Sequence, residues 1–124
     1  MEIIETNKAP APIGPYNQAV VHDNTIYISG QVALDPESGK IDNDNIAEET
    51  HRVMRNLGAV LEAAGSDYDH IIKCSIFILD MNEFEAINEV YSSFFKSHHP
   101  ARETVEVSKL PAGARVEISA IAAR

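Results

Sequence analysis

The chain has 124 residues and a mass of 13.6 kDa, which suits one domain (1–124) and is too short for two ordinary ones. Apolar residues make up 44% and charged residues 23%, a globular composition that excludes a disordered, collagen-like or disulfide-scaffold protein. Nineteen acidic against ten basic side chains give a net charge of −9, which argues against a general nucleic-acid-binding surface.

The first part of the chain is predicted to be β structure interrupted by loops. Residues 3–5 form a short extended segment, and the prolines of residues 9–15 forbid regular pairing, which predicts a rigid loop. Strands are expected at Gln18–His22 and Thr25–Val32, with a hairpin turn at the Asp-Asn pair between them.

The pattern changes from alternating to helical at Ile46. Apolar side chains recur at helical spacing from there to Ala64, which predicts one amphipathic helix. Asn45 is expected to cap its start, and Gly65 to end it in the left-handed conformation. A turn at Asp35–Gly39, with proline and glycine, precedes it.

A second strand-forming region, Ile71–Leu79, is apolar on both faces. This is typical of a central strand that is covered on both sides, or covered on one side and at a subunit contact on the other. It contains Cys74, the single cysteine, so no intrachain disulfide can form; we interpret Cys74 as a small buried hydrophobe.

The last third is predicted to hold one helix and two strands. Asn82 and Glu85 resemble a capping box, and the helix that follows buries Phe84, Ile87, Tyr91, Phe94 and Phe95. Strands are expected at Arg102–Ser108 and Ala114–Ala122. The order β-β-β-α-β-α-β-β predicts an α+β two-layer sandwich, with two helices on one face of a mixed sheet. The other face must be buried somewhere, and oligomerisation is the economical solution.

Several kinds of site are disfavoured by spacing. The five histidines show no zinc spacing, and residues 42–45 begin like a calcium loop but lack its glycine, so we predict no metal or cofactor site. No Gly-x-Gly loop occurs, and Ser29 has no placed histidine and aspartate to make it a nucleophile. No window is long and apolar enough for a membrane span, and the acidic start is unlike a signal peptide, so we expect a soluble cytoplasmic protein.

Two side chains stand out as candidates for binding. Arg102 opens a strand after Pro-Ala, where its planar fork can face a carboxylate, although spacing alone favours a surface ion pair with one of the nineteen acids. Tyr16 ends the rigid loop and either supplies a fixed phenol donor or packs as an ordinary aromatic. Arg102, Thr104 and Glu106 share one strand face, and polar residues also recur on one face of the last strand, so this side is either wet or lines a site.

Seven motifs along the chain, in order and without large gaps, resemble the reactive intermediate deaminase family and its RidA subgroup. They are Ile13–Ala19, Ser29–Gln31 with Asp35-Pro36 and Gly39, Asn56-Leu57 with Val60–Gly65, Asp80–Phe84, Asn88–Tyr91, Pro100–Arg102 with Leu110-Pro111, and Val116–Ala122. The resemblance implies a chorismate-mutase-like fold assembled as a homotrimer, with a central barrel and sites in the clefts between subunits. It also implies hydrolysis of the enamine and imine intermediates 2-aminoacrylate and 2-iminobutanoate, without a cofactor, to 2-oxo acids and ammonia.

The resemblance also implies roles for individual residues. Arg102 matches the arginine that binds the substrate carboxylate, and Tyr16 matches a tyrosine that lines the cleft. Gly30 matches the glycine whose backbone approaches the ligand, with Ser29 beside it. Thr104 matches a position whose backbone carbonyl is thought to face the attacking water.

This chain departs from the family pattern at two positions. Glu103 stands where the family often has serine, and Ser119 stands where RidA members usually carry a glutamate that is thought to orient or activate the water. A serine can hold a water but cannot act as a carboxylate base. Glu117 does not obviously replace it, because members with that glutamate also carry an acid here. The function classes that stay open are therefore an imine deaminase, a trimeric module that binds small carboxylates with little turnover, and the endoribonuclease activity attached to some members by name.

Overall fold

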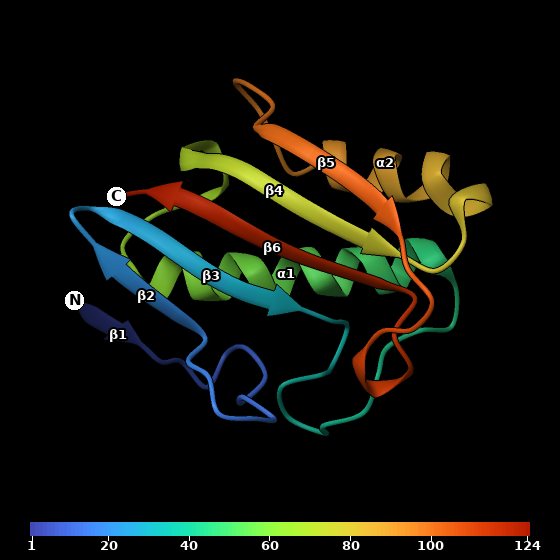
Figure 1. Cartoon of the computed structure of the whole chain (residues 1–124), viewed down its shortest axis with the longest axis horizontal. Helices are drawn as coiled ribbons and strands as arrows, with labels where there is room; N and C mark the ends of the chain where they lie inside the picture. Colours follow the sequence, from blue (N-terminus) through green and yellow to red (C-terminus); the bar gives the residue numbers. More distant parts are fainter.

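The computed structural model describes residues 1–124 and consists of one six-stranded sheet with two α-helices (Figure 1). The strand order across the sheet is β1-β2-β3-β6-β4-β5, and only β4 and β5 pair in parallel. The elements are β1 (Glu2–Ile4), β2 (Ala19–His22), β3 (Thr25–Gln31), α1 (Ile46–Ala63), β4 (Ile71–Ile78), α2 (Phe84–Ser92), β5 (Ala101–Glu106) and β6 (Val116–Ala123). The predicted element order is therefore confirmed, and the ends of all six strands and of α1 lie within two residues of their predicted positions.

The turn and cap signals act as expected. Asp23 and Asn24 both have positive φ, as the tight hairpin between β2 and β3 requires. The Asn45 side chain accepts a hydrogen bond from the backbone N–H of Glu48, 2.8 Å away, at the start of α1. Gly65, with a φ of +80°, turns the chain out of that helix.

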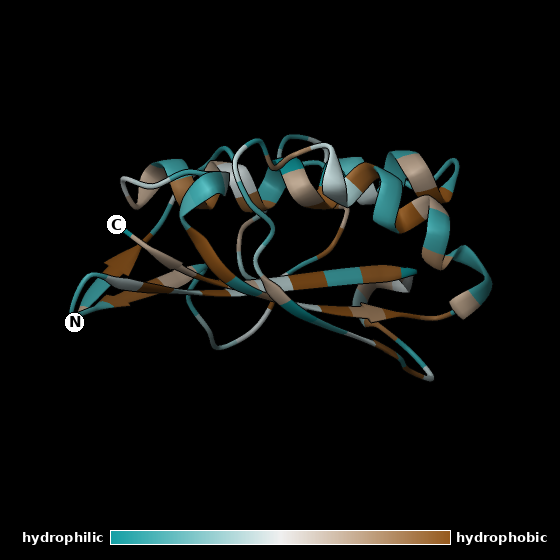
Figure 2. Ribbon diagram, turned by 90° about the horizontal axis from the view of Figure 1, so that it is seen from above, coloured by the Kyte–Doolittle hydropathy of each residue, from teal (hydrophilic) through white to brown (hydrophobic).

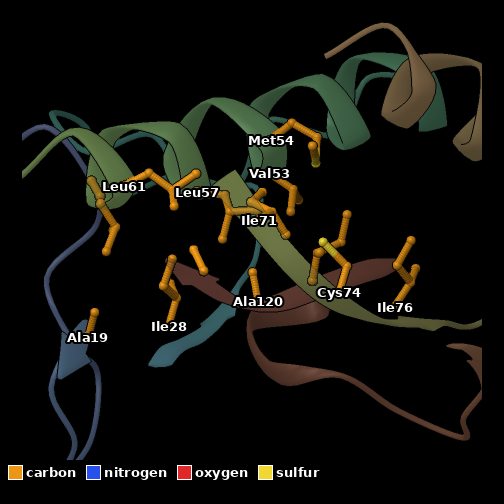
Figure 3. Packing of buried hydrophobic residues seen from close by; sticks show 14 of the residues in the cluster. Ala19, Ile28, Val53, Met54, Leu57, Leu61, Ile71, Cys74, Ile76 and Ala120 are labelled. Carbon is orange, nitrogen blue, oxygen red and sulfur yellow. The ribbon is translucent and has the colours of Figure 1, made fainter. Parts of the chain in front are cut away.

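Both helices lie on the same side of the sheet, so the molecule has two layers (Figure 2). The core fills the space between α1 and the sheet, where Leu57 and Leu61 of the helix face Ile28, Ile71 and other strand residues (Figure 3). Cys74 is one of these buried residues, and burial raises the pKa of its thiol to about 11. The prediction that Cys74 is a small buried hydrophobe is confirmed.

The predicted start and extent of the second helix are wrong. No side chain caps α2, which begins at Phe84. A short 3-10 turn over residues 81–83 leads into it, and Asp80 caps that turn by accepting a hydrogen bond from the backbone N–H of Asn82 at 2.9 Å. The helix ends at Ser92, so Phe94 and Phe95 lie beyond it, although Phe95 still reaches the core. Periodicity alone could not show this end, because the apolar side chains keep their spacing past the last helical turn.

The second face of the sheet has no helix over it. Large apolar side chains lie on it or beside it, including Ile72, which is 50% exposed, Tyr27 at 46% and Val105 at 41%. The side of β4 that faces α1 is buried, whereas Lys73, Ser75 and Phe77 point to the open side. Within a single chain, packing against α1 explains why one face of β4 is apolar, but nothing covers its other apolar face. Neither helix is long and apolar enough to cross a membrane.

Gly58 in α1 is needed for close packing, and its replacement by alanine is expected to lower the free energy of unfolding by about 1–3 kcal/mol. A Cβ at this position would collide with the Tyr68 hydroxyl, which donates a hydrogen bond to the backbone carbonyl of Met54 at 2.8 Å. In an open helix the same change would be favourable, because alanine is the better helix former. Urea unfolding of Gly58→Ala measures the loss, and adding Tyr68→Phe should recover part of it; a stabilised Gly58→Ala protein would contradict the collision.

Candidate active site

Arg102 is the second residue of β5, an edge strand, and its side chain lies on the helix side of the sheet. Its Nη1 donates a hydrogen bond to Asn88 Oδ1 at 2.6 Å, and its guanidinium carbon lies 5.2 Å from the ring centre of Tyr91 and 5.6 Å from that of Phe84. These aromatic contacts hold the planar group in place. Arg102 forms no ion pair with any of the acidic side chains, so the alternative of a surface ion pair is wrong.

A hollow of about 330 Å³ lies in front of this guanidinium. It is lined by Asn88, Tyr91, Ser92, His99, Pro100 and Arg102. Asn88 accepts the only hydrogen bond that Arg102 donates, so most of its N–H donors remain for a ligand. Asn88 lies one helical turn before Tyr91, and this spacing is the signal in the sequence that could have placed it beside Arg102.

Thr104 follows Arg102 on the same side of β5, opposite Ile76 of β4. Its Oγ1 is buried and has no hydrogen-bond partner. A buried hydroxyl without a partner is costly, so this group is available to a water or ligand. The predicted shared face of Arg102, Thr104 and Glu106 is confirmed by their register with the buried residues of β4.

Tyr16 and Gly30 come together at a second place. The Tyr16 side chain is 44% exposed, and its hydroxyl accepts a hydrogen bond from the backbone N–H of Ile13 at 3.3 Å, which leaves its own proton free to donate. It lines a small hollow of about 30 Å³ with Gly30 and Glu117. Gln18 fixes the loop from behind, because its side-chain amide donates to the backbone carbonyls of Thr6 and Pro10 at 3.0 and 2.9 Å.

The position of Gly30 leaves no room for a side chain. A Cβ on it would lie 2.8 Å from Cδ of Glu117, so the glutamate occupies the space beside this backbone. Partial burial raises the pKa of the Glu117 carboxyl above its ordinary value. The neighbouring Ser29 is held away from this hollow, since its hydroxyl donates to the backbone carbonyl of Asn17 at 2.6 Å.

Ser119 lies on the open face of the sheet, in the middle of β6. Its register partner on β4 is Ser75, and both line a hollow of about 180 Å³ with Lys73 and four apolar or aromatic neighbours, Tyr27, Ile28, Ala120 and Ile121. The alternation predicted for the last strand is confirmed, because Glu117, Ser119 and Ile121 are half-buried while Val116, Ile118, Ala120 and Ala122 point into the core.

Glu103 also reaches this open face, from β5. Its carboxylate accepts a hydrogen bond from the Ser75 hydroxyl and lies 2.9 Å from the Lys73 ammonium. These two contacts hold the pKa of Glu103 below its ordinary value, the Ser75 bond contributing most. Glu103 is therefore ionised at neutral pH and oriented by its neighbours. Sequence reasoning missed Ser75 altogether.

The candidate residues of one chain lie on two sides of the sheet. Arg102 and Thr104 face the helices, whereas Ser119 and Glu117 face the open side. We expected β5 and β6 to place their polar residues on the same side of the sheet, and this is wrong. Arg102 and Thr104 pair with the buried residues of β4, whereas Glu117 and Ser119 pair with the residues of β4 that point to the open side. No group of three or more His, Cys, Asp or Glu side chains is placed to hold a metal ion.

Known proteins resemble this chain over nearly its whole length. The profile of a family described as endoribonuclease L-PSP matches residues 6–124. The 2-iminobutanoate/2-iminopropanoate deaminase of Homo sapiens is 47% identical over 120 residues, which cover 97% of this chain and 88% of the human protein. The protein of the same name from Mus musculus is 50% identical over 121 residues, covering 98% and 90% of the two chains.

Solved structures give the same likeness in three dimensions. The crystal structure of E. coli TdcF with bound serine has a TM-score of 0.96 and 38% identity, and the match covers 100% of this chain and 99% of that one. RidA from an Antarctic Psychrobacter has a TM-score of 0.96 and 37% identity, with 100% of both chains covered. One of these relatives thus holds a small amino acid within the same fold.

Proposed function

Since this chain belongs to the endoribonuclease L-PSP family, which includes the reactive intermediate deaminases, we propose that it hydrolyses 2-iminobutanoate and 2-aminoacrylate-derived imines to 2-oxo acids and ammonia. Close relatives over almost the full chain carry the name of this activity. The observation in the structure that carries the proposal is Arg102, a stacked guanidinium without an ion pair that faces a hollow. A planar fork in that state suits a small carboxylate.

The reaction needs little from the protein beyond orientation. Water adds its oxygen to the imine carbon, the nitrogen takes up protons and departs as ammonia, and a 2-oxo acid remains. A protonated imine is already an electrophile, so holding it next to a water can supply several kcal/mol of the barrier reduction. We infer that Arg102 binds the carboxylate while Tyr16 and the Gly30 backbone, with Ser29 beside it, set its tilt. Ser119 and the Thr104 carbonyl then hold the water.

These groups meet only if a second copy of the chain contributes to each site. Arg102 and Ser119 lie on opposite sides of the sheet, and the open side carries exposed apolar side chains. Both observations support a homotrimer with its sheets around a central barrel and its sites in clefts between subunits. Sedimentation of the purified protein tests the mass. We place this trimer in the cytoplasm, in line with its single, buried cysteine.

The proposed activity is tested by competition for the imine. Threonine dehydratase releases 2-iminobutanoate in the presence of semicarbazide, and formation of the semicarbazone is followed with and without the protein. Suppressed trapping is expected. If trapping equals that of the blank while 2-oxobutanoate still raises the unfolding temperature of a folded trimer, the chain is instead a carboxylate-binding module.

The name of the family offers endoribonuclease as another activity. With a net charge of −9 the chain repels a phosphate backbone, and the Arg102 hollow contains a single arginine. We therefore favour the small carboxylate as the ligand.

A further inference from the structure

The hollow in front of Arg102 is lined by hydrogen-bond donors and by no acidic side chain. Its six lining residues are Asn88, Tyr91, Ser92, His99, Pro100 and Arg102. The chain carries nineteen aspartates and glutamates, and none of them lines this hollow. A surface with donors and without carboxylates suits an anionic ligand with several acceptor oxygens. The proposed mechanism uses only Arg102 of this set.

Arg102 and Asn88 together account for one carboxylate. Asn88 Oδ1 accepts a hydrogen bond from Arg102 Nη1 at 2.6 Å, so the amide group of Asn88 keeps its two N–H donors, and neither of them bonds within the chain. The free N–H groups of Arg102 take the carboxylate beside the imine carbon in the proposed reaction. The donors on the other residues of the hollow are then left without an acceptor.

Ser92 and His99 form a second donor group in the same hollow. His99 Nε2 and Ser92 Oγ lie 3.3 Å apart. If the serine donates in this contact, the other ring nitrogen of a neutral imidazole carries an N–H, and if the imidazole donates, the serine proton is free. One donor is therefore left for a ligand in either arrangement. The His99 ring also packs beside Phe95, with 6.0 Å between the ring centres.

The two donor groups are one helical turn apart. Ser92 follows Asn88 by four residues in α2, a spacing that puts both side chains on one face of the helix with about 5–6 Å between their Cβ atoms. A short diacid can span this separation, with one carboxylate on Arg102 and Asn88 and the other on Ser92 and His99. The hollow measures about 330 Å³, which is more room than the smallest imines need.

We propose that Ser92 and His99 bind a second carboxylate, so that the protein also hydrolyses the imines of dicarboxylic amino acids, such as 2-iminosuccinate. This inference rests on the proposed function, because the first carboxylate is the one on Arg102. The reaction is unchanged: the oxygen of water bonds to the imine carbon, the C–N bond breaks, the nitrogen leaves as ammonia, and a 2-oxo dicarboxylate remains. Because the chain has a net charge of −9, these local donors must supply the attraction for a dianion.

The test compares two imines in the same trapping assay. Threonine dehydratase releases 2-iminobutanoate, and an L-aspartate oxidase with catalase releases 2-iminosuccinate. The wild type is expected to suppress semicarbazone formation from both. His99→Leu, which removes the ring donors, is expected to lower the ratio of kcat/KM for 2-iminosuccinate to that for 2-iminobutanoate by about tenfold, the effect of one hydrogen bond to a charged group.

Two further variants show whether the donor itself matters. His99→Gln keeps an N–H at this position and is expected to recover most of the ratio. His22→Leu changes an exposed histidine at the end of β2 and is the matched control, with the wild-type ratio expected.

Inhibition by stable acids gives a readout besides turnover. Succinate is expected to inhibit 2-iminobutanoate hydrolysis at about a tenth of the concentration that butyrate needs, and Ser92→Ala or His99→Leu should remove this preference. The inference is overturned if the wild type acts on 2-iminobutanoate alone, if His99→Leu leaves the ratio unchanged, or if succinate and butyrate inhibit equally. A wild type that hydrolyses neither imine overturns the proposed function as well.

Discussion

Replacing Arg102 with alanine is expected to lower kcat/KM for 2-iminobutanoate by about 100-fold. Hydrogen bonds to charged groups contribute about 1.5–3 kcal/mol each, and 1.4 kcal/mol corresponds to a factor of ten. Loss of a two-pronged contact to the carboxylate, with each bond at the lower end of that range, has an effect of this size. Arg102→Lys should recover less than a tenth of the activity, because a lysine ammonium has no planar fork and stacks less well on Tyr91 and Phe84.

The controls separate binding from folding. Arg55 is an exposed arginine on α1 that forms no ion pair, and Arg55→Ala should retain full activity. Loss of the stacking contacts of Arg102 costs about 1 kcal/mol of stability, so the variant remains folded and its unfolding temperature can be measured. Full activity in Arg102→Ala would contradict a carboxylate-binding role for this residue.

The largest effect on stability is expected at Glu49. This side chain is fully buried, and its two oxygens accept hydrogen bonds from the backbone N–H of Arg115 at 2.6 Å and from its Nε at 2.8 Å. Glu49→Ala removes both of these hydrogen bonds and leaves the partly buried guanidinium with its 3.6 Å contact to Glu83 and its bond to the Asn43 carbonyl. The change is expected to lower the free energy of unfolding by about 3 kcal/mol. In a chain of this length that corresponds to a fall of about 10 °C in Tm.

Two further variants show whether the loss of stability in Glu49→Ala comes from the missing charge and hydrogen bonds. Glu49→Gln keeps an acceptor for the backbone N–H of Arg115 but removes the charge, so its loss should lie between that of alanine and none. Glu62→Gln, exposed on the same helix, should stay within about 0.5 kcal/mol of the wild type. A loss under 1 kcal/mol in Glu49→Ala would show that the buried pair is not what anchors the start of β6 to α1.

The elements could be predicted because each carries a local signal. Apolar periodicity located α1, and the Asp-Asn pair located the hairpin between β2 and β3. The start of α2 was predicted wrongly because a 3-10 turn, which apolar periodicity does not reveal, precedes the helix. Asp80 and Asn82 are both residues that favour a cap position, and in the structure it is Asp80 that caps, at the start of the 3-10 turn before α2.

The arrangement of the candidate site was harder to predict. Alternation shows which residues of one strand share a face, but it does not show which face that is or which residue lies beside them on the next strand. Ser75 and Ser119 are 44 positions apart in the sequence and become neighbours only through the register of β4 and β6. For the same reason the sequence did not show that Arg102 and Ser119 lie on opposite sides of the sheet. β5 pairs with β4 and not with β6, so the relation between these two residues depends on two registers.

The alternation along β5 makes the register of this strand on β4 decisive for the site. Arg102 and Glu103 are consecutive residues, so they point to opposite sides of the sheet, one toward α2 and the other toward the open face. A single inserted or deleted residue between α2 and Pro100 that shifted this strand by one position would turn the guanidinium outward and the carboxylate inward. The pairing of β5 with β4 is therefore what decides the side of each group, and changes of length in the exposed connection before Pro100 are expected to be tolerated as long as that pairing keeps its register.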